Sequence, residues 1–356
     1  MAVTKKLFVD TMGGTSADSY IGVPGELFYD AADGLLRLSD GETEGGAIVG
    51  GGGGDSVPAA YGGSITLGTG AGATDGGVNV IAIGKDAGNN NQGSMAIAIG
   101  RSAGETNQDW NAIAIGRRAG YADQQEETIA IGRYSGNSNQ RYHSIAIGAQ
   151  AGETDQYWGA IAIGRSAGNY GQSYQTVAIG HRAGQDYQNN QAIAIGAYAG
   201  NDTQGQHSIA IGAYAGNQEQ GWAAVAIGEE AGNYQQEFRA IAIGRWAGEQ
   251  SQKSQSVAIG ALAGRFDQGY NAVALGRHAG RNTQGNNAIA IGNMAGEDEQ
   301  HTNSIVINAT GNPLQSVGIG TMVVQSLRQV TGGSIPTGFY QVAWNPTTGE
   351  MIVVTE

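Results

Sequence analysis

One sixteen-residue phrase recurs through most of the chain without insertion or deletion. From Ile81 to Gly292 it has the form (Ile/Val)-Ala-(Ile/Leu)-Gly-x-x-(Ala/Ser)-Gly-x-x-x-Gln. The first glycine of the phrase recurs every sixteen residues from Gly84 to Gly292, which makes fourteen units. A fixed period means that each segment meets only copies of itself, as in a solenoid. The repeat therefore predicts a rod of stacked units rather than a globular core.

The unit itself predicts a coil of short strands. Residues such as Ala112 to Gly116 alternate large and small side chains with period two, which indicates a strand with isoleucine on one face and alanine on the other. Two glycines four residues apart disfavour a helix and supply the bends that close each turn. The expected fold is all-β, a parallel β-roll or β-solenoid of 16-residue rungs. Sixteen registers, from Gly68 to Asn308, would give a rod of about 75 Å.

The two strand faces lead to an expectation about association. We expect the isoleucines to point into the roll, so that Ile195→Asp would disrupt several rungs, whereas Gln206→Ala would be nearly silent. Columns of alanine and glycine allow a second backbone to approach closely. Another copy of the chain is then the expected partner of the alanine face, and we predict a homotrimer with three rolls about one axis.

Composition divides the chain into four regions. Residues 1-49 predict a β-rich attachment module, in which the segments 26–30 and 35–39 flank an Asp-Gly turn. Residues 50-64 form a glycine-rich linker that begins with five consecutive glycines. Residues 65-313 form the repeat shaft. Residues 314-356 predict a C-terminal β-hairpin module, built from the segments 339–344 and 351–354, that serves either trimerisation or as a tip.

Charge and composition exclude several classes of protein. The chain has 62 glycines among 356 residues but only 5 prolines, so it fits neither collagen nor a proline-rich disordered segment. It has no cysteine, and therefore neither disulfides nor a thiolate metal site. A net charge of −13 with scattered charges argues against a nucleic-acid partner. No signal-peptide core and no apolar run of membrane-spanning length are present, so we expect no membrane insertion and no export by the ordinary signal route.

The repeat resembles the head repeats of trimeric autotransporter adhesins of the YadA type. The adhesin phrase Ser-Val-Ala-Ile-Gly is matched at residues 256–260 and, with threonine first, at residues 176–180. The resemblance implies a trimeric, left-handed parallel β-roll used for adhesion. The unit here is longer by a couple of residues, and the secretion signal and C-terminal membrane barrel of those adhesins are missing.

The two ends resemble other proteins. The segments 25–30, 34–41 and 340–350 are similar to parts of virion structural and tail-fibre proteins of cyanobacterial phages. This resemblance implies a viral structural protein, a tail fibre made in the host cytoplasm, released by lysis and carried on the virion. Its expected partners are other tail, baseplate or capsid proteins through the N-terminal module, and a host surface receptor that could be a carbohydrate.

The polar residues predict no catalytic site, no cofactor and no metal centre. Only His143 and His207 share a position in the unit, and they would lie four rungs or about 19 Å apart. Carboxylates such as Glu105, Glu153 and Glu297 recur after the second glycine, which leaves a cation at a single turn open. No cysteine is present and no serine, histidine and carboxylate set stands out, so we expect no enzyme.

The invariant glutamine predicts a structural ladder. Glutamines sixteen residues apart would lie about 4.8 Å from one another, where each amide can donate to the next or to a turn carbonyl. The ladder begins with Gln92, Gln108, Gln124, Gln140, Gln156, Gln172, Gln188 and Gln204.

Aromatic residues supply the candidate receptor-binding positions. Several occupy the tenth position after the first glycine, among them Trp110, Trp158 and Trp222. They either pack between rungs or chains, or form a surface on which sugars stack. Phe339, Tyr340 and Trp344 gather in the C-terminal module, as a receptor tip or as the core of a clamp.

These observations favour a virion fibre that acts as a stiff spacer and binds the host. A monomeric solenoid that binds ice or polysaccharide is an alternative, and it would need one face of regularly repeated residues. A cell-surface adhesin is another. An enzyme acting on polysaccharide would need a clustered acidic groove, which the repeat does not supply.

Overall fold

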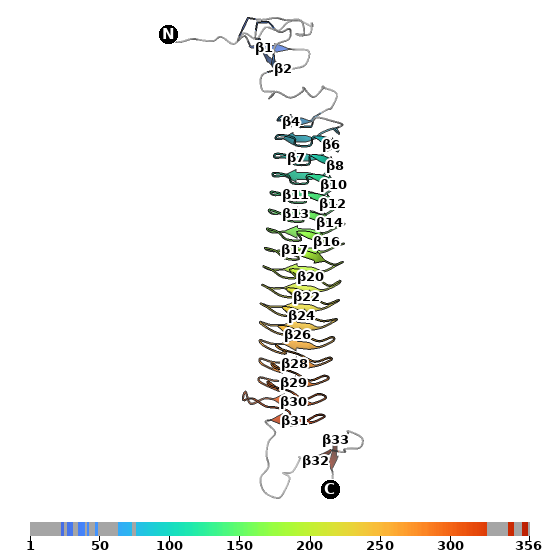
Figure 1. Ribbon diagram of the computed structural model, residues 1–356, viewed down its shortest axis with the longest axis vertical. Coiled ribbons are helices and arrows are strands. Elements are labelled where there is room, and N and C mark those ends of the chain that lie inside the picture. The colour runs from blue at the N-terminus through green and yellow to red at the C-terminus, as the bar shows by residue number, and fades with distance from the viewer. Residues whose placement is uncertain are drawn as a thin grey trace, which may run out of the picture.

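The computed structural model describes residues 23–24, 27–30, 35–39, 41–42, 47–48, 63–72, 76–325, 341–344 and 351–354. For residues 27–30, 35–36, 47–48, 341–344 and 351–354 it describes the backbone alone. All regular secondary structure among these residues is β-strand, and residues 76–325 form a coil of stacked rungs (Figure 1). The fold is a parallel β-solenoid with sixteen residues per turn, as the repeat predicts.

The first strand of each unit builds the longer sheet. Its 17 members pair in parallel, each with the strand of the next unit, so that Ile129 faces Ile145 and Ala130 faces Ala146. These strands are β4 (Ile65–Leu67), β5 (Ile81–Ile83), β7 (Ile97–Ile99), β9 (Ile113–Ile115), β11 (Ile129–Ile131), β13 (Ile145–Ile147), β15 (Ile161–Ile163), β17 (Val177–Ile179), β19 (Ile193–Ile195), β21 (Ile209–Ile211), β23 (Val225–Ile227), β25 (Ile241–Ile243), β27 (Val257–Ile259), β28 (Val273–Leu275), β29 (Ile289–Ile291), β30 (Ile305–Asn308) and β31 (Met322–Gln325).

The second strand of each unit ends on the ladder glutamine and builds an 11-stranded parallel sheet. Its members are β6 (Asn90–Gln92), β8 (Thr106–Gln108), β10 (Ala122–Gln124), β12 (Ser138–Gln140), β14 (Thr154–Gln156), β16 (Tyr170–Gln172), β18 (Asp186–Gln188), β20 (Asp202–Gln204), β22 (Gln218–Gln220), β24 (Tyr234–Gln236) and β26 (Gln250–Gln252). Isolated parallel bridges continue it through Phe266 and Asn282 to Asp298.

The first glycine of the unit is required by backbone crowding. At Gly212 φ is +127°, and an added β-carbon would lie 2.6 Å from the carbonyl oxygen of Gly228 in the next rung. The same approach recurs at the corresponding glycines along the coil. A side chain cannot fit there without moving the neighbouring rung, which explains why this position never varies in the repeat.

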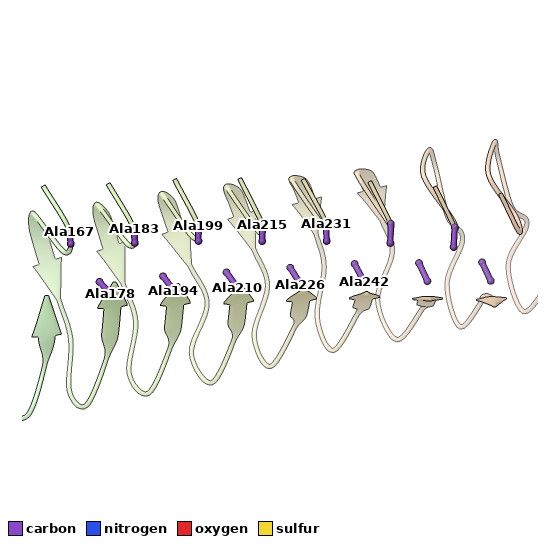
Figure 2. Close-up of a cluster of buried hydrophobic side chains, with 14 of the residues drawn as sticks. Ala167, Ala178, Ala183, Ala194, Ala199, Ala210, Ala215, Ala226, Ala231 and Ala242 are labelled. Carbon is purple, nitrogen blue, oxygen red and sulfur yellow. The ribbon is translucent and has the colours of Figure 1, made fainter. Parts of the chain in front are cut away.

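The apolar part of the interior is almost entirely alanine. In the units from Gly84 to Gly292, the central alanine of the first strand faces the residue three positions after the first glycine, which is alanine everywhere except at Ser135, and both residues have no exposed surface (Figure 2). The space is so narrow that a β-carbon on Gly184 would lie 3.3 Å from that of Ala178. The expectation that the alanine face meets another chain was therefore wrong. The two sheets of one coil approach so closely that the positions between these strands are nearly all alanine, with Ser135 and Val306 as buried exceptions.

The isoleucines lie on the outer face of the first strands. They flank the buried alanine, and side chains alternate along a strand, so they point away from the interior. Ile195 is partly exposed, and Ile179, Ile211 and Leu275 are exposed by 36–42%. The prediction that Ile195 points into the roll was wrong. The period-two pattern identified two faces but not which face is internal.

The coil continues beyond residue 313, where the sequence placed the end of the shaft. β31 pairs in parallel with β30 and brings Met322 opposite Ile305. Near the N-terminus β1 (Leu27–Asp30) pairs antiparallel with β2 (Leu35–Leu38), which pairs antiparallel with β3 (Ala47–Ile48). Near the C-terminus β32 (Gln341–Trp344) pairs antiparallel with β33 (Met351–Val354). The glycines at 50–54 lie outside the described residues.

Candidate functional surface: polar ladders and aromatic columns

The ladder glutamines form one continuous hydrogen-bonded column inside the coil. The amide nitrogen of Gln204 donates to the carbonyl of Ile193 at 2.7 Å and to the side-chain oxygen of Gln220 at 3.1 Å, while its own oxygen accepts from Gln188 at 3.0 Å. The bond between neighbours repeats in the same direction at every step from Gln92 to Gln300. Each ladder glutamine is at most 2% exposed. Buried amides in such a column tie each rung to the next.

Two shorter asparagine ladders run on the outside. At the seventh position after the first glycine, the Asn107 amide donates to Asp123 at 2.9 Å and the Asn139 amide to Asp155 at 2.8 Å. At the eleventh position, Asn287 accepts from Asn271 at 3.2 Å. Sequence reasoning missed both ladders. These positions have φ near +55°, where asparagine is tolerated better than most residues, and the frequent asparagine there was the available signal.

The aromatic column lies on the outside at the tenth position of the unit. Its members are between 37% and 50% exposed: Trp110, Tyr142, Trp158, Tyr174, Trp222, Phe238 and Tyr270. Trp110 and Trp158 are three rungs or about 14 Å apart, and Trp222 lies four rungs farther on. The structure thus places these three predicted residues along one side of the rod but does not bring them together.

Two aromatic clusters include members of this column. In the first, the ring of Trp158 meets His143 edge-on at 6.3 Å, and Tyr157 lies 5.4 Å from Tyr174. In the second, Trp222 and Phe238 stack at 5.1 Å with their planes 12° apart, and the Arg239 guanidinium lies over both rings. Rings from neighbouring rungs therefore pack on one another and still leave surface exposed. Packing and ligand binding are both compatible with this arrangement.

A shallow groove of about 490 Å³ opens beside the second cluster. Phe238 forms one part of its lining, and the ion pair between Glu237 and Lys253, with 2.9 Å between oxygen and nitrogen, forms another. Burial raises the pKa of Glu237, but hydrogen bonds from Lys253 and Ser254 outweigh it, so that the pKa lies below its usual value. The hydrogen bond to Glu237 raises the pKa of Lys253. An aromatic face beside fixed polar groups can bind a ligand by stacking and hydrogen bonding.

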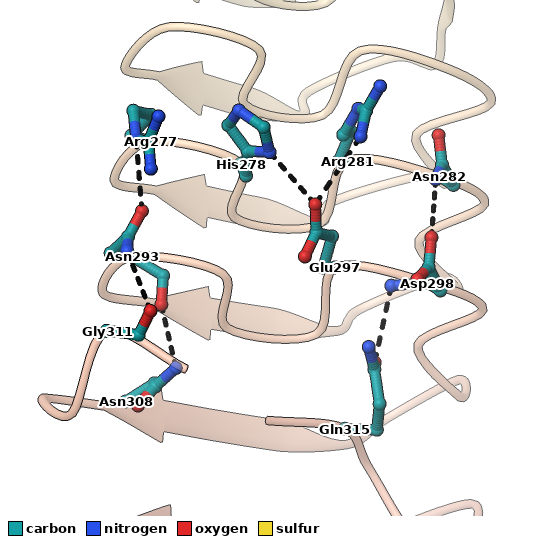
Figure 3. A network of polar contacts seen from close by, with 10 residues as sticks. All are labelled: Arg277, His278, Arg281, Asn282, Asn293, Glu297, Asp298, Asn308, Gly311 and Gln315. Atoms are coloured by element: carbon teal, nitrogen blue, oxygen red, sulfur yellow. Dashed lines mark hydrogen bonds and ion pairs between the residues drawn. The ribbon is translucent and has the colours of Figure 1, made fainter. Parts of the chain in front are cut away.

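Polar contacts hold the last rungs together near the C-terminal end of the coil (Figure 3). The Glu297 carboxylate accepts from His278 at 2.9 Å and pairs with Arg281 at 3.5 Å. The backbone nitrogen of Asp298 donates to Gln315 at 3.3 Å. Glu297 thus has protein partners, and these contacts have the character of cross-links between rungs rather than of a cation site.

The predicted positions of the C-terminal module are the next to be placed. Phe339 and Tyr340 lie outside the described residues, and so does the side chain of Trp344 in β32. Within the described part of the chain, no group of three or more histidine, aspartate and glutamate residues could hold a metal ion. No helix in that part is long and apolar enough to cross a membrane.

Comparison with known proteins adds no relative. No family model, curated protein or solved structure matches the chain.

Proposed function

We propose that the chain is the subunit of a virion fibre, a structural protein without catalytic activity that acts as a stiff spacer and attaches the particle to its host. The observation that carries this proposal is the unbroken pairing from β4 to β31, together with the glutamine column inside it. Each rung is bonded to the next both by backbone and by buried side chains. A rod built in this way resists bending, since local opening would break both sets of bonds.

The outer isoleucine face supports association of three copies. Two apolar columns follow the first strands through the whole coil, and several of their side chains are more than a third exposed. Monomeric proteins rarely expose continuous apolar patches beyond a few hundred Å². Three parallel rods about one axis would cover this strip in each copy, with a closed cyclic symmetry.

The aromatic clusters and the C-terminal segment support a role in attachment. Exposed rings on a rigid scaffold suit binding to sugars on a cell surface. In the proposed arrangement the N-terminal module joins the particle, and Phe339, Tyr340 and Trp344 lie in the C-terminal module near the tip.

Sedimentation and cell binding test this proposal. The full chain should sediment as three copies of 36.4 kDa and bind host cells. A monomer would contradict the trimer. Tyr340→Ala and Trp344→Ala then locate the receptor site: intact trimers that lose binding indicate the tip, and intact trimers that still bind indicate the aromatic clusters of the shaft. Loss of the trimer would make the C-terminal segment a clamp.

A polysaccharide-binding solenoid that works as a monomer is the second candidate. The exposed aromatic clusters favour it, and the same sedimentation experiment separates it from the fibre. Ice binding is less well supported, because the described outward positions carry no regular array of threonines, and the regular isoleucine columns are assigned to association between copies.

A further inference from the structure

One edge of the rod is basic although the chain as a whole is acidic. The two positions that follow the first glycine of each unit define this basic edge. It carries three acidic residues, Asp86, Glu229 and Glu230, but half of the 18 lysines and arginines of the chain: Lys85, Arg101, Arg117, Arg118, Arg133, Arg165, Arg182, Arg245 and Arg277. The net charge of −13 is therefore distributed unevenly around the coil.

The charges are densest near the N-terminal end of the coil. Lys85, Arg101, Arg117 and Arg133 occupy the same position on four consecutive rungs, about 4.8 Å apart, and all four are exposed. We call these four residues and Arg118 the cationic cluster. Neighbouring cations at this spacing repel one another, and an anionic partner would relieve that repulsion.

Three guanidiniums of the cationic cluster surround one ring. Arg117, Arg118 and Arg133 lie over Tyr134 at 5.1, 5.9 and 5.5 Å from the ring centre. Among the described residues none of these three arginines forms an ion pair within 4.0 Å with a carboxylate. Stacking on Tyr134 orients the guanidiniums and leaves their charge uncompensated. By contrast, Arg265 and Arg281 at the fifth position of their units pair with glutamates.

We propose that the cationic cluster binds an acidic polysaccharide, whose carboxylate or sulfate groups pair with Arg117, Arg118 and Arg133. Planar guanidiniums bind such oxyanions through two parallel hydrogen bonds. The inference rests on the proposed attachment function and names the class of surface polymer that the shaft recognises.

The spacing differs from that of a DNA duplex. There is one cation for each rung of about 4.8 Å, whereas each strand of a B-form duplex carries a charge about every 3.4 Å along its axis. Single-stranded nucleic acid is separated from an acidic polysaccharide by experiment, through the binding of polyuridylate.

The test compares two variants of the full-length protein that lose the same charge. The first is R117Q/R118Q/R133Q. Glutamine tolerates the positive φ of Arg118, because Gln150 lies at the same position of its own unit and also has a positive φ. The control is R141Q/R245Q/R277Q, which removes three exposed arginines that belong neither to the cationic cluster nor to the two aromatic clusters. A third variant, R117K/R118K/R133K, changes the same three positions but keeps the charge. Its binding shows whether a loss in the glutamine variant comes from the missing charge or from altered folding.

Binding to alginate, a polyuronate, is measured at several salt concentrations, with dextran and polyuridylate as comparison polymers. We expect salt-dependent binding to alginate alone. The glutamine variant should lose at least tenfold in affinity and show a smaller dependence on salt, by about two units of slope. The control should stay within about twofold, and the lysine variant should lie between the two.

Three outcomes would overturn the inference: no preference of the wild type for alginate over dextran, equal losses in the control and the cluster variant, or equally tight binding of polyuridylate. Sedimentation and host-cell binding are recorded on the same samples. Trimers that bind host cells but not alginate would contradict the acidic-polysaccharide inference and leave the proposed attachment function in place. A wild type that fails to bind host cells removes the attachment function itself.

Discussion

At the residue scale, the strongest constraint on the unit is the three left-handed positions that it has in addition to its two invariant glycines. The second, seventh and eleventh residues after the first glycine have positive φ in nearly every unit, and most of them are not glycine. A β-carbon is disfavoured there by about 1–2 kcal/mol. Thr203, a β-branched residue at φ +48°, is among the least suitable occupants. The neighbouring rungs hold these conformations in place through the bonds between units.

Thr203→Asn should therefore stabilise the protein, by about 1 kcal/mol in the free energy of unfolding. Asparagine tolerates this conformation, and its amide could donate to Glu219 in the next rung as Asn107 does to Asp123. The matched control is Thr106→Asn, in a strand where φ is not positive, and it should bring no gain. Equal effects in thermal unfolding would mean that backbone conformation does not limit stability here.

Gln204→Met should cost about 2–5 kcal/mol, because it keeps the volume but removes the ladder bonds. The carbonyl of Ile193 and the side-chain oxygen of Gln220 would each lose their donor inside the coil. Gln206→Ala, at a partly exposed position two residues away, should change stability by less than about 0.5 kcal/mol. Chemical denaturation of both variants measures the contrast. Similar midpoints would show that the buried amides contribute little.

The Asp186 carboxyl should make stability depend on pH. Burial first, and then the charge of Asp202 on the next rung, raise its pKa. The folded chain holds this proton more tightly than the unfolded chain, so the group favours folding increasingly as pH falls through the raised value towards about 3.9. Asp186→Asn should stabilise the protein at pH 7 by about 0.2–1 kcal/mol. The gain should vanish below about pH 3.9, and it should be smaller in the Asp202→Asn background. A gain that persists in acid would point to another cause.

Some columns of residues along the coil could be predicted from the sequence more easily than others. The glutamine column was readable because its residue never changes. The basic edge and the asparagine ladders were harder to recognise, because each of these positions holds a mixture of residues, although the constant register already aligns them.

At the scale of the strand, the two faces of Ile193–Ile195 should respond differently to charge. Ala194→Asp places an unpaired carboxylate among the fully buried alanines of the interior, and should unfold several rungs. Ile195→Asp alters the outer face and should leave the coil of each chain intact while weakening association. Circular dichroism reports the coil and sedimentation reports association. Loss of β-structure in both variants would contradict the assignment of the two faces.

The strands show what the sequence could and could not predict about an element. Period two identified the first strand of the unit but not the second, and the paired glycines indicated the bends of the chain. It did not identify the interior, because large side chains are usually taken to be internal. Here the two sheets lie too close together for isoleucine, and that distance is a property of the closed turn rather than of either strand.

At the scale of the whole molecule, a complete unit should be removable. Deleting residues 193–208 joins Ala192 to Ile209 and restores the phrase in register. We expect a folded protein, shorter by about 4.8 Å, with an unchanged oligomeric state. Deletion of residues 193–200 alone removes half a turn and should abolish folding of the adjacent rungs. Small-angle scattering gives the length. Failure of the complete-unit deletion would mean that individual rungs have specific roles.

The constant sixteen-residue register has a consequence for how the chain folds. From β4 to β30 its strand pairs join residues sixteen positions apart, and the last pair, β30 with β31, joins residues seventeen apart. Adding units lengthens the rod without lengthening the loop that any new contact must close, so relative contact order falls as the chain grows. Folding can then begin at any pair of adjacent units and proceed in both directions by adding one unit at a time. Its rate is set by the addition of one unit rather than by the length of the coil.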